Sequence, residues 1–76
     1  MTTRRYTVFF EAQSGGAYHA ACPALPGCHS EGDTLDEATA NIREAIEVYV
    51  ESMIAHNGTP RIEDLVIRPV EIAISG

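Results

Sequence analysis

Two cysteines and two histidines, close together in the first half of the chain, are the first candidates for chemistry. Cys22 and Cys28 have five residues between them, His29 follows directly, and His19 lies on the preceding stretch. Zinc needs about four convergent ligands, usually with about two to four residues between paired cysteines. Adjacent Cys28 and His29 would point to opposite faces of a strand. The pattern therefore favours two buried packing cysteines over a metal site, a disulfide or a Cys–His nucleophile, and we expect no metal and no cofactor.

Three carboxylates, Glu11, Asp33 and Asp36, offer a second kind of chemistry. A metal-dependent nuclease of the RNase H type holds two ions about 4 Å apart between clustered carboxylates. This alternative is disfavoured, because turn and helix-start preferences explain Asp33 and Asp36 equally well and an acidic surface repels a nucleic-acid substrate. We expect a protein that is not an enzyme and has no catalytic residues.

The charge of the chain indicates a protein partner. Its 76 residues include five arginines, no lysine and eleven acidic residues, which gives a net charge of −6. Phosphate binding draws on clustered basic residues, so we expect no direct nucleic-acid binding by this chain alone. No stretch is long enough for a signal segment or a membrane span, so we expect a cytoplasmic protein with reduced thiols and no membrane partner. Acidity favours a basic partner, and it also serves solubility.

The first half of the chain has the pattern of three strands. Aromatic and β-branched residues alternate before Gly15 and Gly16, which suit a tight hairpin. Pro23 and Pro26 then fix φ and remove two N–H donors, so a stiff loop is expected between the second and third strands. The predicted strands cover residues 5–12, 17–22 and 28–33.

A long helix follows. Thr34 and Glu37 match the capping box, and Asp36 adds negative charge at the helix start. Apolar residues then recur every three or four positions, which predicts a helix over 35–56 with one buried stripe. The stripe consists of Leu35, Ala38, Ile42, Ala45, Ile46, Tyr49 and Met53.

A last strand is expected over 66–74, with Val70, Ile72 and Ile74 on one face and Pro69 favouring an edge position. The chain then forms a single α+β domain over residues 1–76, in the order β-β-β-α-β. Its four-stranded mixed sheet has the strand order 3-2-1-4, one long helix covers one face, and the last crossover is right-handed. The face without a helix is expected to carry Thr7, Phe9, Glu11, His19 and Glu71. An exposed Phe9 there would indicate a partner or a second copy.

Three motifs occur in order along this pattern. They are Cys22-Pro23-Ala24-Leu25-Pro26-Gly27-Cys28, Gly32-Asp33-Thr34-Leu35-Asp36-Glu37-Ala38 and Asn41-Ile42-Arg43-Glu44-Ala45-Ile46. Together they resemble the HicB-like antitoxin family, whose signature is a P-x-L-P-G-C loop, a G-D-T-x-x-E-A helix start and an N-x-x-E-A-I segment. The resemblance covers about Tyr6 to Met53.

The resemblance implies a trimmed RNase H or double-stranded-RNA-binding layout and the neutralisation of a small basic ribonuclease toxin, HicA. Longer relatives carry a DNA-binding module after this domain. The sequence ends at Gly76, directly after the last predicted strand, so we expect the short form without that module. Most motif residues are expected to be structural: Gly27 and Gly32 permit tight backbone geometry, and Asn41 is expected to hydrogen-bond the loop or sheet backbone.

The hypothesis is that the acidic domain covers the RNA-binding face of a HicA-like toxin. The alternative is an orphan homo-oligomeric module of unknown ligand, because a small domain with an uncovered sheet face gains stability from a second copy. A homo-oligomer is expected alongside the toxin partner. The predicted partner contacts are Glu11, Tyr18, Pro23, Leu25, Pro26, Glu31 and Asp33.

Overall fold

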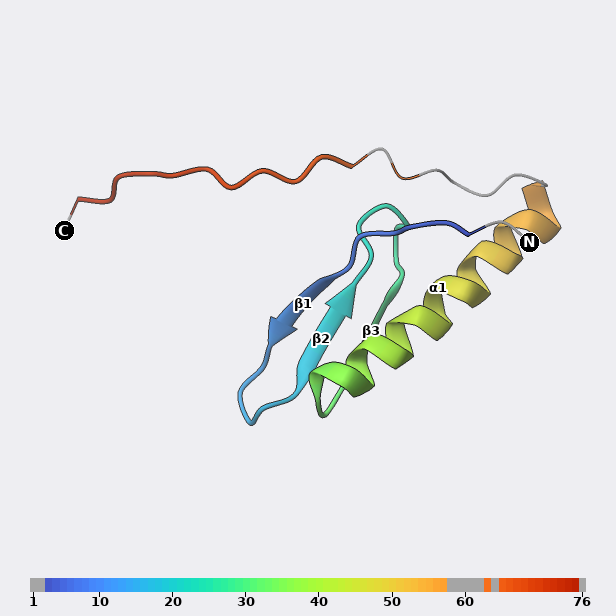
Figure 1. The fold of residues 1–76 in the computed structure, drawn as a ribbon, viewed down its shortest axis with the longest axis horizontal. Coiled ribbons are helices and arrows are strands. Elements are labelled where there is room, and N and C mark those ends of the chain that lie inside the picture. Colours follow the sequence, from blue (N-terminus) through green and yellow to red (C-terminus); the bar gives the residue numbers. More distant parts are fainter. Residues whose placement is uncertain (1–2, 58–62, 64, 76) are drawn as a thin grey trace.

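The chain has an α+β fold in which three antiparallel strands precede one long helix (Figure 1). The computed structural model describes residues 3–57, 63 and 65–75. The first three predicted strands and the helix are confirmed, although each strand is shorter than expected. The elements are β1 (Phe9–Ala12), β2 (Tyr18–Ala21), β3 (His29–Gly32) and α1 (Leu35–Asn57).

The sheet is a meander with the order β1-β2-β3. Phe9 of β1 lies opposite Ala21 of β2, and Ala21 lies opposite His29 of β3. The predicted hairpin turn connects β1 and β2, with φ of 92° at Gly15 and 93° at Gly16. Side chains with a Cβ rarely adopt this region, so the glycine pair sets where the hairpin closes and thereby its register.

The helix begins where the capping signal predicts. The Glu37 N–H donates to Thr34 Oγ1 at 3.1 Å, and the Ala38 N–H donates to the Thr34 carbonyl at 2.9 Å. Asp36 and Glu37 place negative charge in the first turn, where the helix dipole favours it. This start directs the apolar stripe of α1 at the sheet from Ala38 onward. Leu35, predicted as part of the buried stripe, is 46% exposed, because it lies in the first turn beyond the sheet contact.

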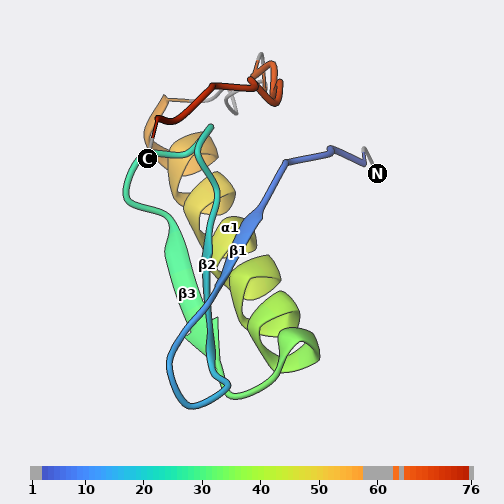
Figure 2. The same cartoon turned by 90° about the vertical axis from the view of Figure 1, so that its left-hand side faces the viewer.

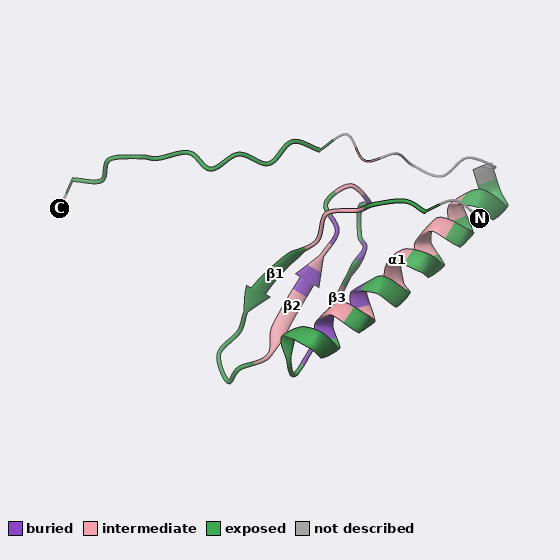
Figure 3. Cartoon of the chain, viewed as in Figure 1, coloured by how far each residue is buried: buried purple, intermediate pink, exposed green. Residues whose placement is uncertain are grey.

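The helix covers one side of the sheet more than the other. It packs chiefly against β3 and less against β2, while β1 lies at the margin of the sheet away from α1 (Figure 1; Figure 2 gives the view turned by 90°). Figure 3 shows the buried residues gathered between α1, β2 and the loop after β2. The buried hydrophobic residues are Ala20, Cys22, Leu25, Cys28, Ala38 and Ile42.

Two motif residues allow the close contact between α1 and β3. A Cβ added to Gly32 would lie 2.4 Å from the Ala38 backbone nitrogen, so no other residue fits without moving the helix. Asn41 Nδ2 donates to the Glu31 carbonyl at 2.8 Å, which confirms the predicted bond to the sheet backbone. Gly32 and Asn41 thus set the distance and the register between the helix and the edge strand.

The fourth predicted strand is wrong. Residues 66–74 are in no strand, and the sheet of the described chain has three strands rather than the order 3-2-1-4. Residues 65–75 instead run away from the body as an extended segment, with Val70, Ile72 and Ile74 between 75% and 81% exposed (Figure 1). The radius of gyration is therefore 15.1 Å, against about 11 Å for a compact chain of this length. Alternation alone predicted a strand, but a strand also needs an edge to pair with.

Candidate functional site

The candidate site is the sheet face that points away from α1, here called the outer sheet face. Side chains alternate between the two faces of a strand. Ala20 of β2 is fully buried on the helix side, so its neighbours His19 and Ala21 face outward. The register then places two cross-strand rows on this face. They are Phe9–Ala21–His29 and Glu11–His19–Glu31.

The second row places two carboxylates beside one imidazole. Glu11 lies directly opposite His19 on one side, and Glu31 lies directly opposite it on the other. Directly opposed residues have Cβ atoms about 4.5–5.5 Å apart, so each glutamate lies beside His19 and the two glutamates are roughly 10 Å from each other. The His19 and His29 rings lie 5.5 Å apart between centroids, at 38°. Gln13 Nε2 also donates to Glu11 Oε1 at 3.1 Å and helps to orient that carboxylate.

The apolar part of the outer sheet face is its Phe9 row. Phe9 is 47% exposed although it lies within a strand. Beside it lie Ala21 and the exposed His29, and the loop that carries Pro23 and Pro26 follows at the end of β2. A small apolar surface therefore adjoins the acidic row, which is the usual arrangement of a protein-binding surface.

The predicted contact residues are only partly brought together. Glu11 and Glu31 meet across His19, and Pro23 and Pro26 are exposed at the loop end of the sheet. The other two polar candidates lie at the hairpin end, where Asp33 is exposed after β3 and Tyr18 is half-buried in the row of Gly32, facing the helix. Sequence reasoning placed Phe9 and His19 on the uncovered face but missed His29, whose period-two spacing to Glu31 was the available signal.

Leu25 needs a correction, because the structure places it in the core with no exposed surface. Its N–H donates to the Cys22 carbonyl at 3.1 Å, and its own carbonyl accepts from Cys28 N–H at 3.0 Å. The stiff loop folds back over the core at this residue. Leu25 therefore anchors the loop from inside, while the two prolines remain on its surface.

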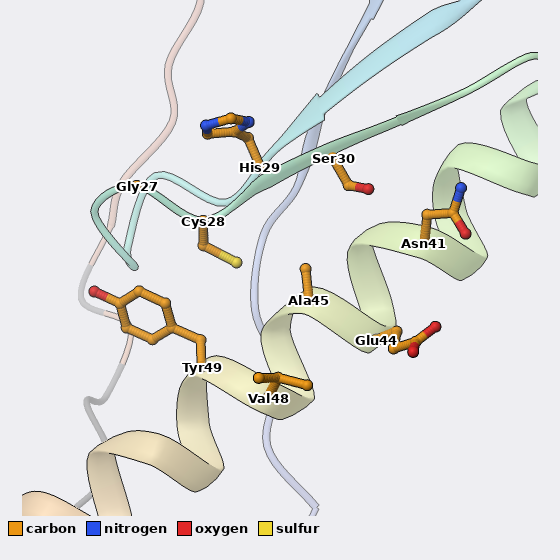
Figure 4. Close-up of a pocket in the computed structure, with 9 residues that line it drawn as sticks. All are labelled: Gly27, Cys28, His29, Ser30, Asn41, Glu44, Ala45, Val48 and Tyr49. Carbon is orange, nitrogen blue, oxygen red and sulfur yellow. The ribbon is translucent and has the colours of Figure 1, made fainter.

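The cysteines are unsuited to nucleophilic or metal chemistry. Both are free and buried, which confirms their packing role. Burial raises the pKa of both thiols, and the neighbouring Cys22 also raises that of Cys28, so both stay protonated at neutral pH. Cys28 points toward α1 whereas His29 points away from it (Figure 4). Among the described residues no three His, Cys, Asp or Glu side chains could hold a metal, and these include the nuclease candidates Glu11, Asp33 and Asp36.

A shallow hollow of about 470 Å³ lies between β3 and the middle of α1 (Figure 4). Its polar amide, Asn41 Nδ2, is already bonded to the Glu31 carbonyl. Cys28 and Ala45 form its floor, and Val48 lies on its rim with 60% of its surface exposed. His29, Ser30 and Glu44 also line the hollow, but the Cys28 thiol is buried and His29 points away from it. The hollow is the open side of the helix–strand contact.

The comparisons with known proteins agree with this architecture. Residues 6–69 match the family described as the HicB-like antitoxin of bacterial toxin–antitoxin systems. The chain belongs to this family. As a HicB-like antitoxin it has an implied toxin partner, and the resemblance seen in its motifs is confirmed.

Relatives share most of this HicB-like chain. A UPF0150 protein of Synechocystis is 54% identical over 70 residues, which covers 91% of this chain and 87% of that protein. A UPF0150 protein of Thermoplasma acidophilum is 47% identical over 53 residues, covering 70% and 77%. The crystal structure of the N-terminal domain of the Burkholderia pseudomallei antitoxin HicB aligns with a TM-score of 0.62 and 32% identity, covering 91% of this chain and 69% of that one.

The described part of this HicB-like chain includes no helix of the length and apolar character that a membrane crossing requires. The long helix α1 carries charged residues along one side, among them Arg43, Glu44, Glu47 and Glu51. Its apolar stripe is used against the sheet.

Proposed function

We propose that this HicB-like antitoxin domain neutralises a small basic ribonuclease toxin of the HicA type in the cytoplasm by covering its RNA-binding face. Family membership supports the antitoxin role, and so does the 32% identity to the N-terminal domain of antitoxin HicB. A protein that blocks an RNA-binding surface must compete with phosphates for the basic side chains there. An acidic, phosphate-free surface of matching size does this without itself being a substrate.

The observation that carries the mechanism is the row Glu11–His19–Glu31. The two carboxylates project from the two strands that flank His19, on the same face of the sheet, and the chain as a whole carries a net charge of −6 without a single lysine. Lysine or arginine side chains of the toxin would bind between the two glutamates. Long-range attraction between the acidic domain and a basic toxin also speeds their encounter.

The rest of the surface supplies apolar contact and rigidity. Phe9 gives the apolar centre that charged residues alone lack, and an interface of standard size would bury about 800 Å² on each partner. The loop is held by backbone bonds at Cys22, Leu25 and Cys28, so Pro23 and Pro26 are already ordered before binding. The loop therefore loses little conformational entropy when it binds, which favours affinity. The exposed Asp33 extends the acidic surface at the other end.

The test is a charge reversal on the outer sheet face. The variant Glu11→Lys/Glu31→Lys is expected to bind a HicA-like toxin of the native host at least about tenfold more weakly, because attraction becomes repulsion. Binding is measured by calorimetry with a catalytically inactive toxin, and neutralisation by the cleavage of RNA by the active toxin. The wild-type affinity is expected to fall with added salt.

The matched control is Glu47→Lys/Glu51→Lys, which makes the same change of charge on exposed positions of α1. This variant is expected to stay close to wild type in both assays. Equal loss of binding in the two variants would show that only net charge matters and would remove the outer sheet face from the mechanism. Full neutralisation by the Glu11/Glu31 variant would contradict the proposal directly.

A further inference from the structure

The segment 65–75 exposes more apolar surface than a single folded chain retains. Val66, Val70, Ile72 and Ile74 are each between 75% and 81% exposed, and they all occupy even-numbered positions. In an extended chain, even-numbered residues share one face. Arg68 lies on this face between Val66 and Val70, so the continuous β-branched part is Val70, Ile72 and Ile74, which is exposed as in an unpaired strand.

The start of the segment is attached to the chain just before β1. The Glu63 carboxylate accepts hydrogen bonds from the Thr7 N–H and from Thr7 Oγ1, the latter at 2.8 Å. Residue 63 is thus held two residues before β1 begins. From there the segment leaves in the same general direction as β1 but separates from it (Figure 1).

This attachment leaves too little of β1 for the segment to pair with within its own chain. From Thr7 to the end of β1 at Ala12 is five residues, or about 17 Å at 3.3 Å per residue. From Glu63 to Ile74 is eleven residues, or about 36 Å when extended. In such a register Arg68 would already lie beside Ala12. Residues 70–74, the apolar half of the segment, would extend beyond the sheet.

The edge of β1 is also uncovered. All four residues of β1 are exposed, and α1 lies over the other side of the sheet. Gln13 N–H donates to the Ala17 carbonyl, and bonded pairs alternate along an antiparallel ladder. The N–H groups of Phe10 and Ala12 therefore point away from β2, toward an edge where no described strand is paired.

We propose that residues 70–74 of one copy pair with the free edge of β1 in a second copy, so that two chains exchange these segments in a symmetric dimer. In this exchange residues 70–74 of each copy pair with the β1 edge of the other copy, so both exposed elements are covered. A two-fold arrangement forms the contact twice and closes the assembly. Residues 65–75 contain one Arg and one Glu and are neutral together, so they can approach a second acidic chain without repulsion. Pro69 lies just before the pairing residues, where its missing N–H costs nothing.

The test uses the full chain without a toxin, so its result is independent of the proposed function. Light scattering after size exclusion is expected to show a dimer for wild type, with dissociation on dilution. The variant Val70→Glu/Ile74→Glu is expected to be a monomer with an unchanged far-ultraviolet spectrum, because both positions are exposed in the single chain. The matched control is Val48→Glu, 60% exposed on α1, which should remain a dimer.

Hydrogen exchange then locates the contact. The amides of Phe10, Ala12 and residues 70–74 are expected to exchange slowly at high protein concentration and quickly in the monomer. Protection of 70–74 without Phe10 and Ala12 would mean that the segments pair with each other, and the assignment to β1 would be wrong. A strictly monomeric wild type, or a dimer that survives Val70→Glu/Ile74→Glu, would overturn the proposal.

Discussion

Along β3 the sheet is covered by α1, whereas along β1 it is open. At the β3 margin, Gly32 lets the helix backbone approach and Asn41 joins the helix to the Glu31 carbonyl. At the β1 margin every strand residue is exposed and residues 65–75 run off into solvent. The same short sheet therefore has one margin completed within the chain and one left for another chain.

The two margins also differ in how their apolar residues are used. Five of the six buried hydrophobic residues in the described part of the chain form one cluster that joins α1, β2 and the loop around Leu25. The β-branched residues of 65–75 add nothing to that cluster and remain exposed. Stability should then depend on the β3 side alone, and association on the β1 side.

The largest effect is expected from Leu25→Ala. Leu25 is fully buried, so its truncation should lower the free energy of unfolding by about 3 kcal/mol, through lost burial and the cavity left behind. Ile74→Ala removes a similar side chain that is 81% exposed and should change it by less than about 0.5 kcal/mol. Urea unfolding of both variants at micromolar concentration compares the two regions. Equal losses would show that the segment 65–75 is part of the core.

A smaller difference is expected between two side-chain amides. Asn41→Ala removes the donor to the Glu31 carbonyl and should cost about 1 kcal/mol. Gln13→Ala removes two exposed bonds to Glu11 near the β1 margin and should cost almost nothing, because water replaces them. The urea-unfolding midpoints of the Asn41→Ala and Gln13→Ala variants, compared with wild type, test this difference. A larger loss of unfolding free energy in Gln13→Ala than in Asn41→Ala would contradict the expectation that stability depends on the β3 margin.

The smallest effect on stability is expected from a change of pH, and it arises from Cys22 and Cys28 in the core beneath α1. Burial raises the pKa of the Cys22 and Cys28 thiols above the ordinary value of 9.0. Below that value both states are protonated and stability is unaffected. At higher pH the unfolded chain releases these protons first, so the free energy of unfolding should fall as pH rises above about 9. Cys22→Ala/Cys28→Ala should reduce the slope measured by urea unfolding between about pH 8 and pH 10, and an unchanged slope would assign it to other groups.

The local elements were predictable because their signals are local. The capping residues Thr34 and Glu37, the apolar stripe of the helix and the glycine pair of the hairpin each act within a few residues, and they appear in the structure as expected except for Leu35 of the stripe, which is exposed. The three motifs also identified the family from the sequence, since they combine turn, cap and packing requirements at fixed spacing.

The candidate site was predictable only in part. Charge and alternation indicated an acidic outer face, but the meeting of Glu11 and Glu31 on the two sides of His19 depends on the register of two strand pairs. Leu25 was predicted as a loop residue that contacts a partner. Hydrogen bonds among Cys22, Leu25 and Cys28 instead fold the loop over the core and bury Leu25. Neither result follows from local spacing.

The sequence by itself determined the three strands, the helix, the acidic charge and the HicB-like motifs, because periodicity and capping act between near neighbours. Only the tertiary structure decided which margin of the sheet the helix covers and that residues 66–74 do not form a fourth strand. A strand exists only when paired, and pairing depends on whether distant segments reach each other with the right length and register. Here the attachment of Glu63 at Thr7 leaves the apolar half of the last segment beyond the sheet of its own chain.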